Sequence, residues 1–173
     1  MKIEVIRGDI TRFEGDAIVN AANETLRGGG GVDGAIHRAA GPRLLEACMQ
    51  FPVGNDLSMT TRCPAGGAVV TPGFDLKAKH VIHTVGPRYY RHSPERAADL
   101  LAQAHGASLL AAEGHGFKTV AFPAISCGVF AFPIPDAARI AVSVMREKDW
   151  NIEAVTFVMF TEETYEAFKA EVG

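Results

Sequence analysis

The chain has 173 residues, 47% hydrophobic and 21% charged, a balance typical of one globular domain over residues 1–173 and not of a disordered or fibrous protein. The net charge of −3 argues against a general polyanion binder. Three cysteines without a Cys-x-x-Cys pair predict neither a disulfide framework nor a zinc site, and favour a reduced, cytoplasmic setting. The N-terminal MKIEVIRGDI lacks a signal-peptide core, and the most apolar stretch, 120–135, is interrupted by prolines and a glycine and predicts no membrane span.

The first two predicted strands both end in polar residues. Lys2–Arg7 alternates apolar and charged side chains and precedes Asp9, and the apolar run Ala17–Ala21 carries Asn20 near its end, with Asn23 just beyond. Open α/β sheets present ligand-binding groups at such strand ends. The alternatives are an Asx-type turn at Asp9 and loop scaffolding by the two asparagines.

Four consecutive glycines, Gly28–Gly31, come next. Because glycine loses the most conformational entropy on folding, we interpret this run as a loop whose amides approach a phosphate, ahead of a helix expected over Gly34–Ala40. A flexible surface loop is the alternative. Asp33 and His37 are four residues apart, a spacing that suits a base and its orienter, although the absence of a nearby nucleophile favours a structural histidine.

The middle of the chain carries no evident chemistry. Phe51–Gly67 is rich in turn-forming residues and is expected to be an irregular connecting segment. His83 has no partner at a metal-binding spacing and is expected to be structural. The elements expected here are a helix from Pro42, strands over Ala68–Thr71 and His80–Val85 separated by the turn residues Pro72-Gly73, and an amphipathic helix over Pro94–Glu113.

A second loop of unusual composition follows the short buried strand Thr119–Phe122. The small residues Ser126, Cys127 and Gly128 allow backbone amides to crowd together, and Val129-Phe130 follows at once. Amides beside an aromatic ring suit a phosphate-and-sugar ligand, whereas the alternative is a tight turn with Phe130 in the core. Cys127 has no His/Asn pair of the kind that activates a cysteine nucleophile.

A helix over Pro135–Lys148, a strand over Ala154–Phe160 and a helix over Thr161–Val172 complete the chain. Phe160 is interpreted either as a platform on which a base stacks or as a core residue. Strands that alternate with helices in this way predict an α/β protein with a largely parallel sheet. The polar or aromatic candidates that fall at carboxyl ends of predicted strands are Asp9, Asn20, Asn23, Ser126 and Phe160.

These residues carry a resemblance to the macrodomain family, and within it to MacroD-type macrodomains. The matching segments are GDIT at Gly8–Thr11, AIVNAAN at Ala17–Asn23, GGGGVDGAIHRAAGP at Gly28–Pro42, VIHTVGP at Val81–Pro87 and FPAISCGVFAFP at Phe122–Pro133. They span nearly the whole chain in family order, and the glycine-rich segment is highly specific. The resemblance implies a three-layer α/β/α fold with a mixed, roughly six-stranded central sheet and an ADP-ribose cleft.

The resemblance also implies residue roles. Asp9, with the Ile10 backbone, would bind the adenine amino group, and Phe160 would line the adenine pocket. Asn23 would hold the distal ribose, with Asn20 among the ligand-binding residues, and Asp33 matches the acid implicated in catalysis. The two loops would wrap the diphosphate with backbone amides, with Phe130 packed beneath the distal ribose; the loop residues implied are Gly30, Gly31, Val32, Ser126, Cys127, Gly128, Val129 and Phe130.

The implied activity is hydrolysis of ADP-ribosyl esters, both those on Asp or Glu side chains of proteins and O-acetyl-ADP-ribose. An ester needs only a fixed sugar and an activated water, so no cofactor or metal is expected; Asp33 would deprotonate that water or, in a substrate-assisted route, only position it. The alternatives are a non-catalytic ADP-ribose reader and an RNA- or nuclease-associated regulator, which the lack of a basic stripe disfavours. We expect a monomer that binds ADP-ribose and ADP-ribosylated proteins, and neither nucleic acid nor a membrane.

Three departures from the family pattern stand out. The second loop reads Ser-Cys-Gly where Ser-Thr-Gly is frequent, which leaves a backbone-amide role intact. Phe130 and Phe132 stand where tyrosines are common, so hydroxyl contacts would be lost there. Val53–Arg62 matches no family segment.

Overall fold

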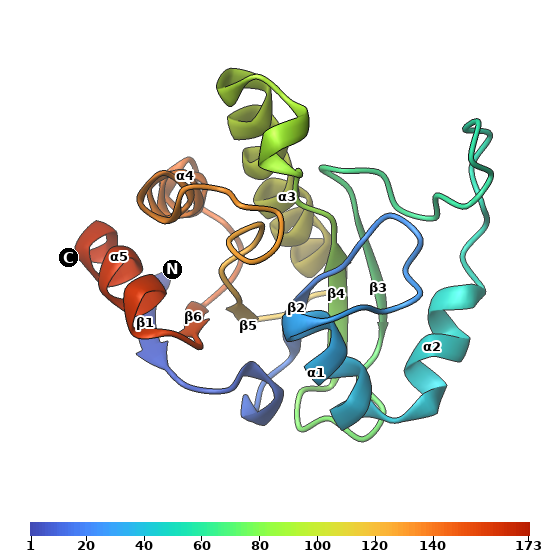
Figure 1. Cartoon of the computed structure of the whole chain (residues 1–173). Coiled ribbons are helices and arrows are strands. Elements are labelled where there is room, and N and C mark those ends of the chain that lie inside the picture. The colour runs from blue at the N-terminus through green and yellow to red at the C-terminus, as the bar shows by residue number, and fades with distance from the viewer.

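A six-stranded sheet lies between two layers of helices in the computed structural model, which describes all residues 1–173 (Figure 1). The strand order is β1-β6-β5-β2-β4-β3; β3 runs antiparallel to β4 and every other pair is parallel. The strands are β1 (Lys2–Arg7), β2 (Ala17–Ala21), β3 (Ala68–Pro72), β4 (His80–Thr84), β5 (Thr119–Phe122) and β6 (Ala154–Met159). The helices are η1 (Ile10–Arg12), α1 (Gly31–Ala40), α2 (Pro42–Met49), η2 (Tyr89–Arg91), α3 (Pro94–Gly114), α4 (Ile134–Arg146) and α5 (Glu162–Val172).

Each face of the sheet has its own apolar core because side chains alternate along the central strands. Ala17 and Val19 of β2 belong to the core that lies under α3, α4 and α5, whereas Ile18 belongs to the core under α1 and α2. Strands buried on both faces read as largely apolar runs, as AIVNA of β2 does, whereas HVIHT of β4 also carries His80, His83 and Thr84. The predicted three-layer α/β/α fold with a mixed sheet is therefore confirmed.

Several element boundaries differ from the sequence-based expectation by one or two residues, and the two largest differences are at the start of α1 and in the connection from β3 to β4. Helix α1 begins at Gly31, not at Gly34, because Gly30 takes the extended N-cap conformation and the Gly34 amide already donates to the Gly30 carbonyl. The last glycine of the run, with Val32 and Asp33, therefore forms the first turn of the helix. The connection from β3 to β4 is longer than a Pro72-Gly73 turn: Pro72 closes β3 and residues 73–79 form the link.

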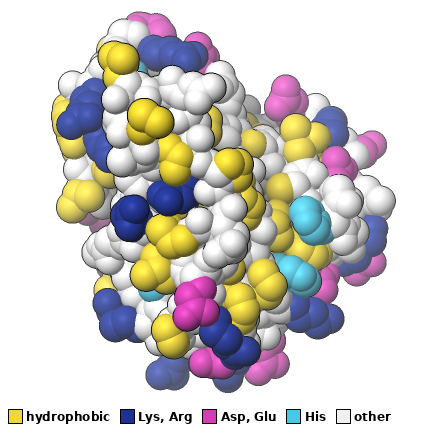
Figure 2. All heavy atoms as spheres, turned by 90° about the vertical axis from the view of Figure 1, so that its right-hand side faces the viewer, with side chains coloured by type: hydrophobic (Ala, Val, Ile, Leu, Met, Phe, Trp, Pro, Cys, Tyr) yellow, Lys and Arg dark blue, Asp and Glu magenta, His cyan; other side chains and the backbone are white.

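The surface carries charges of both signs. On the face that shows the right-hand side of Figure 1, Lys and Arg side chains are interspersed with acids and apolar groups and form no continuous basic band (Figure 2). None of the helices has the length and hydropathy that crossing a lipid bilayer requires.

Candidate functional site

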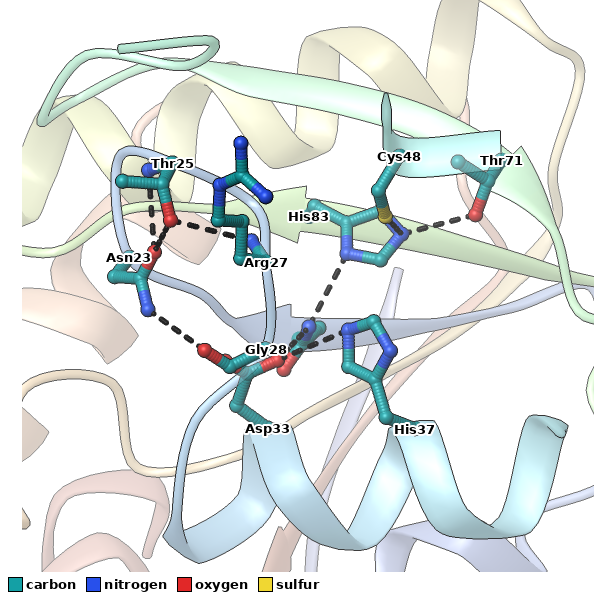
Figure 3. Close-up of polar contacts among 10 residues, drawn as sticks. Asn23, Thr25, Arg27, Gly28, Asp33, His37, Cys48, Thr71 and His83 are labelled. Carbon is teal, nitrogen blue, oxygen red and sulfur yellow. Dashed lines mark hydrogen bonds and ion pairs between the residues drawn. The ribbon is translucent and has the colours of Figure 1, made fainter. Parts of the chain in front are cut away.

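Asp33 is the buried acid at the start of α1. It is 5% exposed, its Oδ1 accepts from Asn20 Nδ2 at 2.9 Å, and His37 Nε2 lies 3.4 Å from the same oxygen (Figure 3). Burial raises the pKa of Asp33 above its ordinary value, against the opposing effects of the Asn20 hydrogen bond and the His37 charge. The second oxygen, Oδ2, faces Gly29: a methyl group added there would lie 3.4 Å from it.

Asn23 makes hydrogen bonds that hold the segment before the glycine run. Its Nδ2 donates to the Gly28 carbonyl at 3.0 Å, and its Oδ1 accepts from the Thr25 amide at 3.1 Å and the Thr25 hydroxyl at 2.6 Å (Figure 3). The same Nδ2 would lie 3.7 Å from a Cβ at Gly29. Asn23 and Asp33 therefore both approach Gly29.

The glycine run presents backbone donors that the fold leaves unused. The amides of Gly29, Gly30, Gly31 and Val32 donate no hydrogen bond within the protein. Those of Gly31 and Val32 also belong to the first turn of α1, where amide groups have no intrahelical acceptor and the helix dipole favours an anion. The backbone of Gly29 can lie close to α1 because residue 34 is a glycine. A Cβ at residue 34 would lie 2.5 Å from the Gly29 carbonyl oxygen.

The second loop follows β5 and is organised in the same way. The amides of Gly128, Val129 and Phe130 donate no hydrogen bond within the protein, and Val129 is 90% exposed. Ser126 adopts a φ of 64° and its hydroxyl donates to the Pro87 carbonyl at 2.8 Å, which fixes the start of the loop. Cys127 lies between Ser126 and Gly128. Burial raises the pKa of its thiol to about 12, which argues against a role as a nucleophile.

An ion pair links the two loop regions. Arg88 Nη1 donates to Glu24 Oε1 at 2.6 Å, and the Arg88 guanidinium lies 4.7 Å from the centroid of the Phe130 ring. The Tyr89 amide donates to the Phe130 carbonyl at 2.9 Å. Phe130 therefore packs beneath a cation and is not a core residue, whereas Phe132 is 3% exposed and packs against Tyr89.

Asp9 and Phe160 lie at the carboxyl ends of the paired strands β1 and β6. Asp9 Oδ1 accepts from the Thr11 amide at 2.9 Å and the Thr11 hydroxyl at 2.7 Å, which lowers the pKa of Asp9 and caps η1. Oδ2 of Asp9 and the amide of Ile10 make no hydrogen bond within the protein. Phe160 is 80% exposed, so the core-filling alternative is wrong.

The order of the strands spaces these groups along one edge of the sheet. From β1 past β6 and β5 to β2 there are three strand spacings, about 14 Å in all. Asp9 and the exposed ring of Phe160 lie at one end, the unpaired amides of the second loop lie in the middle, and the glycine run with Asn23 and Asp33 lies at the other end. This arrangement suits an elongated ligand with an aromatic head and an anionic centre.

Sequence reasoning missed some residues and placed another differently. Arg88 and Glu24 are 64 positions apart and gave no local signal. The i, i+4 spacing of Asp33 and His37 suits the contact that the structure has between them, at 3.4 Å. Asn20 is 0% exposed, with its Nδ2 held by Asp33 and His83, so it supports Asp33 from within the core. No group of three or more His, Cys, Asp or Glu side chains is arranged to hold a metal ion.

A family model, curated relatives and solved structures all relate this chain to macrodomains. The model of the Macro domain matches residues 19–141. A macro domain-containing protein of Xanthomonas campestris is 50% identical over 97% of this chain and 93% of its own length, and an O-acetyl-ADP-ribose deacetylase of Salmonella typhimurium is 48% identical over 94% and 89%. A mutant macrodomain of Oceanobacillus iheyensis solved with ADPR superposes with a TM-score of 0.89 at 37% identity, covering 98% of this chain and 91% of that one. The chain therefore belongs to the Macro domain family.

Proposed function

We propose that the protein binds ADP-ribose along the carboxyl edge of its sheet and hydrolyses ADP-ribosyl esters, as a MacroD-type enzyme. The observation that carries the proposal is the pair of loops with unpaired amides after β2 and β5, beside a buried acid. Amides bind a diphosphate without cationic side chains, which suits a protein with a net charge of −3. The Salmonella relative named O-acetyl-ADP-ribose deacetylase and the Oceanobacillus structure solved with ADPR support it.

The ligand would lie with adenine between Asp9 and Phe160. The ionised Asp9 has a free oxygen for the adenine amino group, and the exposed Phe160 ring offers a stacking surface. The diphosphate would take the amides of both loops, and the distal ribose would lie over Phe130 with its ester beside Asn23 and Asp33. The substrates are O-acetyl-ADP-ribose and mono-ADP-ribose esters of Asp or Glu side chains.

Asp33 has the geometry of a general base. Oδ1 is held by Asn20 and His37, which leaves Oδ2 on the Gly29 side to accept a proton from a water molecule. The water oxygen attacks the ester carbonyl, the bond from that carbon to the ribose oxygen breaks, and the proton on Asp33 passes to the departing ribose oxygen. The products are ADP-ribose and a carboxylic acid. Burial, by raising the pKa of Asp33, makes it a stronger base than a solvated aspartate.

The test combines calorimetry with ADP-ribose and hydrolysis of both esters for the wild type, Asn23→Ala and Asp33→Asn. We expect Asp33→Asn to bind ADP-ribose within about threefold of the wild type and to lose about 10²- to 10⁴-fold in kcat, the usual contribution of a general base. Asp99→Asn, an exposed acid on α3, is the matched control and should leave both values unchanged.

Three outcomes would contradict parts of the proposal. A wild-type protein that binds ADP-ribose but turns over neither ester is a reader, not an enzyme. Full turnover in Asp33→Asn would exclude Asp33 as the base and leave the substrate-assisted route. Failure to bind ADP-ribose would reject the proposal as a whole.

A further inference from the structure

Behind Asp33, a chain of buried polar side chains crosses the core beneath α1 and α2. Asn20 of β2 and His83 of β4 are direct partners in the parallel register, and both are 0% exposed. Asn20 Nδ2 lies 2.9 Å from Asp33 Oδ1 and 3.1 Å from His83 Nδ1, and His83 Nε2 lies 2.9 Å from Thr71 Oγ1 of β3 (Figure 3). Side chains from β2, β4 and β3 thus form one row of polar groups that ends at Asp33.

We propose that His83 and Thr71 are positioning residues, which hold the Asn20 amide with its nitrogen toward Asp33 and thereby keep Asp33 ionised. The inference rests on the proposed function only in the role of Asp33 as the base. Neither His83 nor Thr71 reaches the edge of the sheet where the ligand would lie, since they are 0% and 3% exposed.

The orientation of Asn20 carries a cost. With Nδ2 shared between Asp33 and His83, its Oδ1 has no hydrogen-bond partner within the protein although it is buried. A buried acceptor without a partner destabilises the folded state, because it has lost its hydrogen bonds to water. A rotated amide would turn Oδ1 toward His83 and leave the nitrogen unpaired instead, so the choice between the two orientations depends on which ring nitrogen of His83 carries the proton.

The tautomer of His83 determines the orientation of the Asn20 side-chain amide. Burial lowers the pKa of His83 to about 3, so the ring is neutral at physiological pH and has one donor and one acceptor nitrogen. When Nε2 carries the proton and donates to Thr71 Oγ1, Nδ1 accepts from Asn20, and the second amide hydrogen of Asn20 is donated to Asp33. When Nδ1 carries the proton, Asn20 must rotate, and its Oδ1 then lies 2.9 Å from an Asp33 oxygen, which is tolerable only for a protonated acid.

Thr71 supports the Nε2-protonated tautomer because its hydroxyl oxygen can accept that proton; the same hydroxyl can donate to Nε2 when the ring is protonated on Nδ1, so it satisfies Nε2 in either form. Without its hydroxyl, a proton on Nε2 would be buried with only the Cys48 sulfur at 3.8 Å, a weak acceptor. The other tautomer would instead present a lone pair that the Cys48 thiol, neutral because burial raises its pKa to about 11, can satisfy. Loss of the Thr71 hydroxyl should therefore favour the rotated Asn20 and the protonated Asp33.

The other charged or titratable groups around Asp33 do not offer an alternative control of this kind. His37 on the same helix stabilises the carboxylate by its charge, Cys48 of α2 is a neutral thiol, and Arg62 acts on Cys48 from the connecting segment. A substitution at Thr71 removes no hydrogen bond of His37 or Arg62, whereas the neutral Cys48 thiol becomes the remaining polar neighbour of His83 Nε2. A shift in Asp33 ionisation in a Thr71 variant can therefore be assigned to the His83–Asn20 pair.

The test is Thr71→Val, which keeps the branched shape and removes the hydroxyl, with Thr71→Ser as the rescue. The matched control is Thr156→Val, the same change at a buried threonine (5% exposed) of β6 that donates to Glu4 at 3.1 Å. Nitrogen-15 NMR of the imidazole gives the tautomer of His83, carbon-13 NMR gives the titration midpoint of the Asp33 carboxyl, and hydrolysis of O-acetyl-ADP-ribose against pH gives kcat and KM.

We expect wild-type His83 to carry its proton on Nε2. In Thr71→Val the Nδ1-protonated form should appear, the Asp33 midpoint and the acidic limb of the kcat profile should both move upward by about one pH unit, and KM should change less than twofold; one pH unit is a tenfold loss of kcat on the acidic limb. Thr71→Ser and Thr156→Val should resemble the wild type.

The NMR measurements separate this inference from the proposed function. If the wild type hydrolyses neither ester but the tautomer and the Asp33 midpoint shift together in Thr71→Val, the proposed function fails and the positioning role stands. A wild-type His83 protonated on Nδ1, or an Asp33 midpoint that Thr71→Val leaves unmoved, overturns the positioning role whatever the activity. If Thr71→Val does not fold, His83→Gln is measured by the same carbon-13 titration and is held to the same criterion.

Discussion

Glu24 and Arg88 form a partly buried ion pair that joins the segment before the glycine run to the second loop. Their side chains are 25% and 24% exposed, and Arg88 also lies over the ring of Phe130. The Glu24 carbonyl accepts from the amides of Arg62 and Cys63, so this end of the pair is anchored to a third segment. The pair therefore connects the two loops whose unpaired amides define the candidate site.

The first prediction concerns this connection. Arg88→Met should weaken ADP-ribose binding about fivefold, equivalent to about 1 kcal/mol. The substitution removes the cation that lies over the Phe130 ring and the ion pair that connects the second loop to Glu24. A double-mutant cycle with Glu24→Gln, read by urea unfolding, should give a coupling energy of about 0.5–1 kcal/mol. Additive effects of the two substitutions would show that the loops are not coupled through this pair.

The second prediction concerns the exposed ring at the end of β6. Phe160→Ala should weaken ADP-ribose binding about 5- to 150-fold, since stacking of a base on an aromatic ring contributes about 1–3 kcal/mol. Its free energy of unfolding should change by less than about 0.5 kcal/mol because the ring is 80% exposed. Leu110→Ala on α3, 58% exposed, is the control. Unaltered affinity in Phe160→Ala would remove this residue from the site.

The third prediction concerns the cost of burying Asp33. Burial raises the folded pKa of Asp33 above its ordinary value of 3.8, so the folded state binds more protons than the unfolded state between these two pKa values. The contribution of Asp33 to stability is therefore full below pH 3.8 and is lost as pH rises through the folded pKa. Asp33→Asn should therefore be more stable than the wild type at pH 7, and the gain should shrink toward pH 3.5. Urea unfolding at both values tests this, and a variant that is less stable at pH 7 would contradict it.

The fourth prediction concerns a glycine needed for close approach. A Cβ at Gly86 would overlap Ser126 Oγ and lie 2.6 Å from Ile125 Cγ2, so Gly86→Ala should cost about 1–3 kcal/mol and displace the second loop. Gly106→Ala is the matched control: it lies inside α3 with nothing within 4 Å of the added carbon, and should stabilise the protein by about 0.5–1 kcal/mol. Equal effects at the two positions would show that contact with Ser126 is not what Gly86 provides.

Much of the fold was predictable because its signals are local. The strands at Lys2–Arg7, Ala17–Ala21 and Thr119–Phe122 were predicted with their observed bounds, since apolar runs between turn residues define them. The start of α1 was not, because glycine disfavours helix interiors, and the helical state of Gly31 depends on contacts that the fold supplies.

The sequence by itself determined which residues reach the carboxyl edge of the sheet, because strand direction and the length of each run decide that without any knowledge of packing. Asp9, Asn20, Asn23, Ser126 and Phe160 were identified in this way, whereas the glycine run was identified by its composition and Asp33 by its place after that run and by the family resemblance. Only the tertiary structure decided how they are supported: Asn20 with His83 and Thr71, and Glu24 with Arg88, meet across strands or loops. The physical reason is that a hydrogen bond between residues 12 to 64 positions apart depends on strand register and side-chain direction, which no local pattern encodes. The four glycines were recognisable as a loop from the sequence, and the unpaired amides that make them a candidate anion site became visible only with the fold.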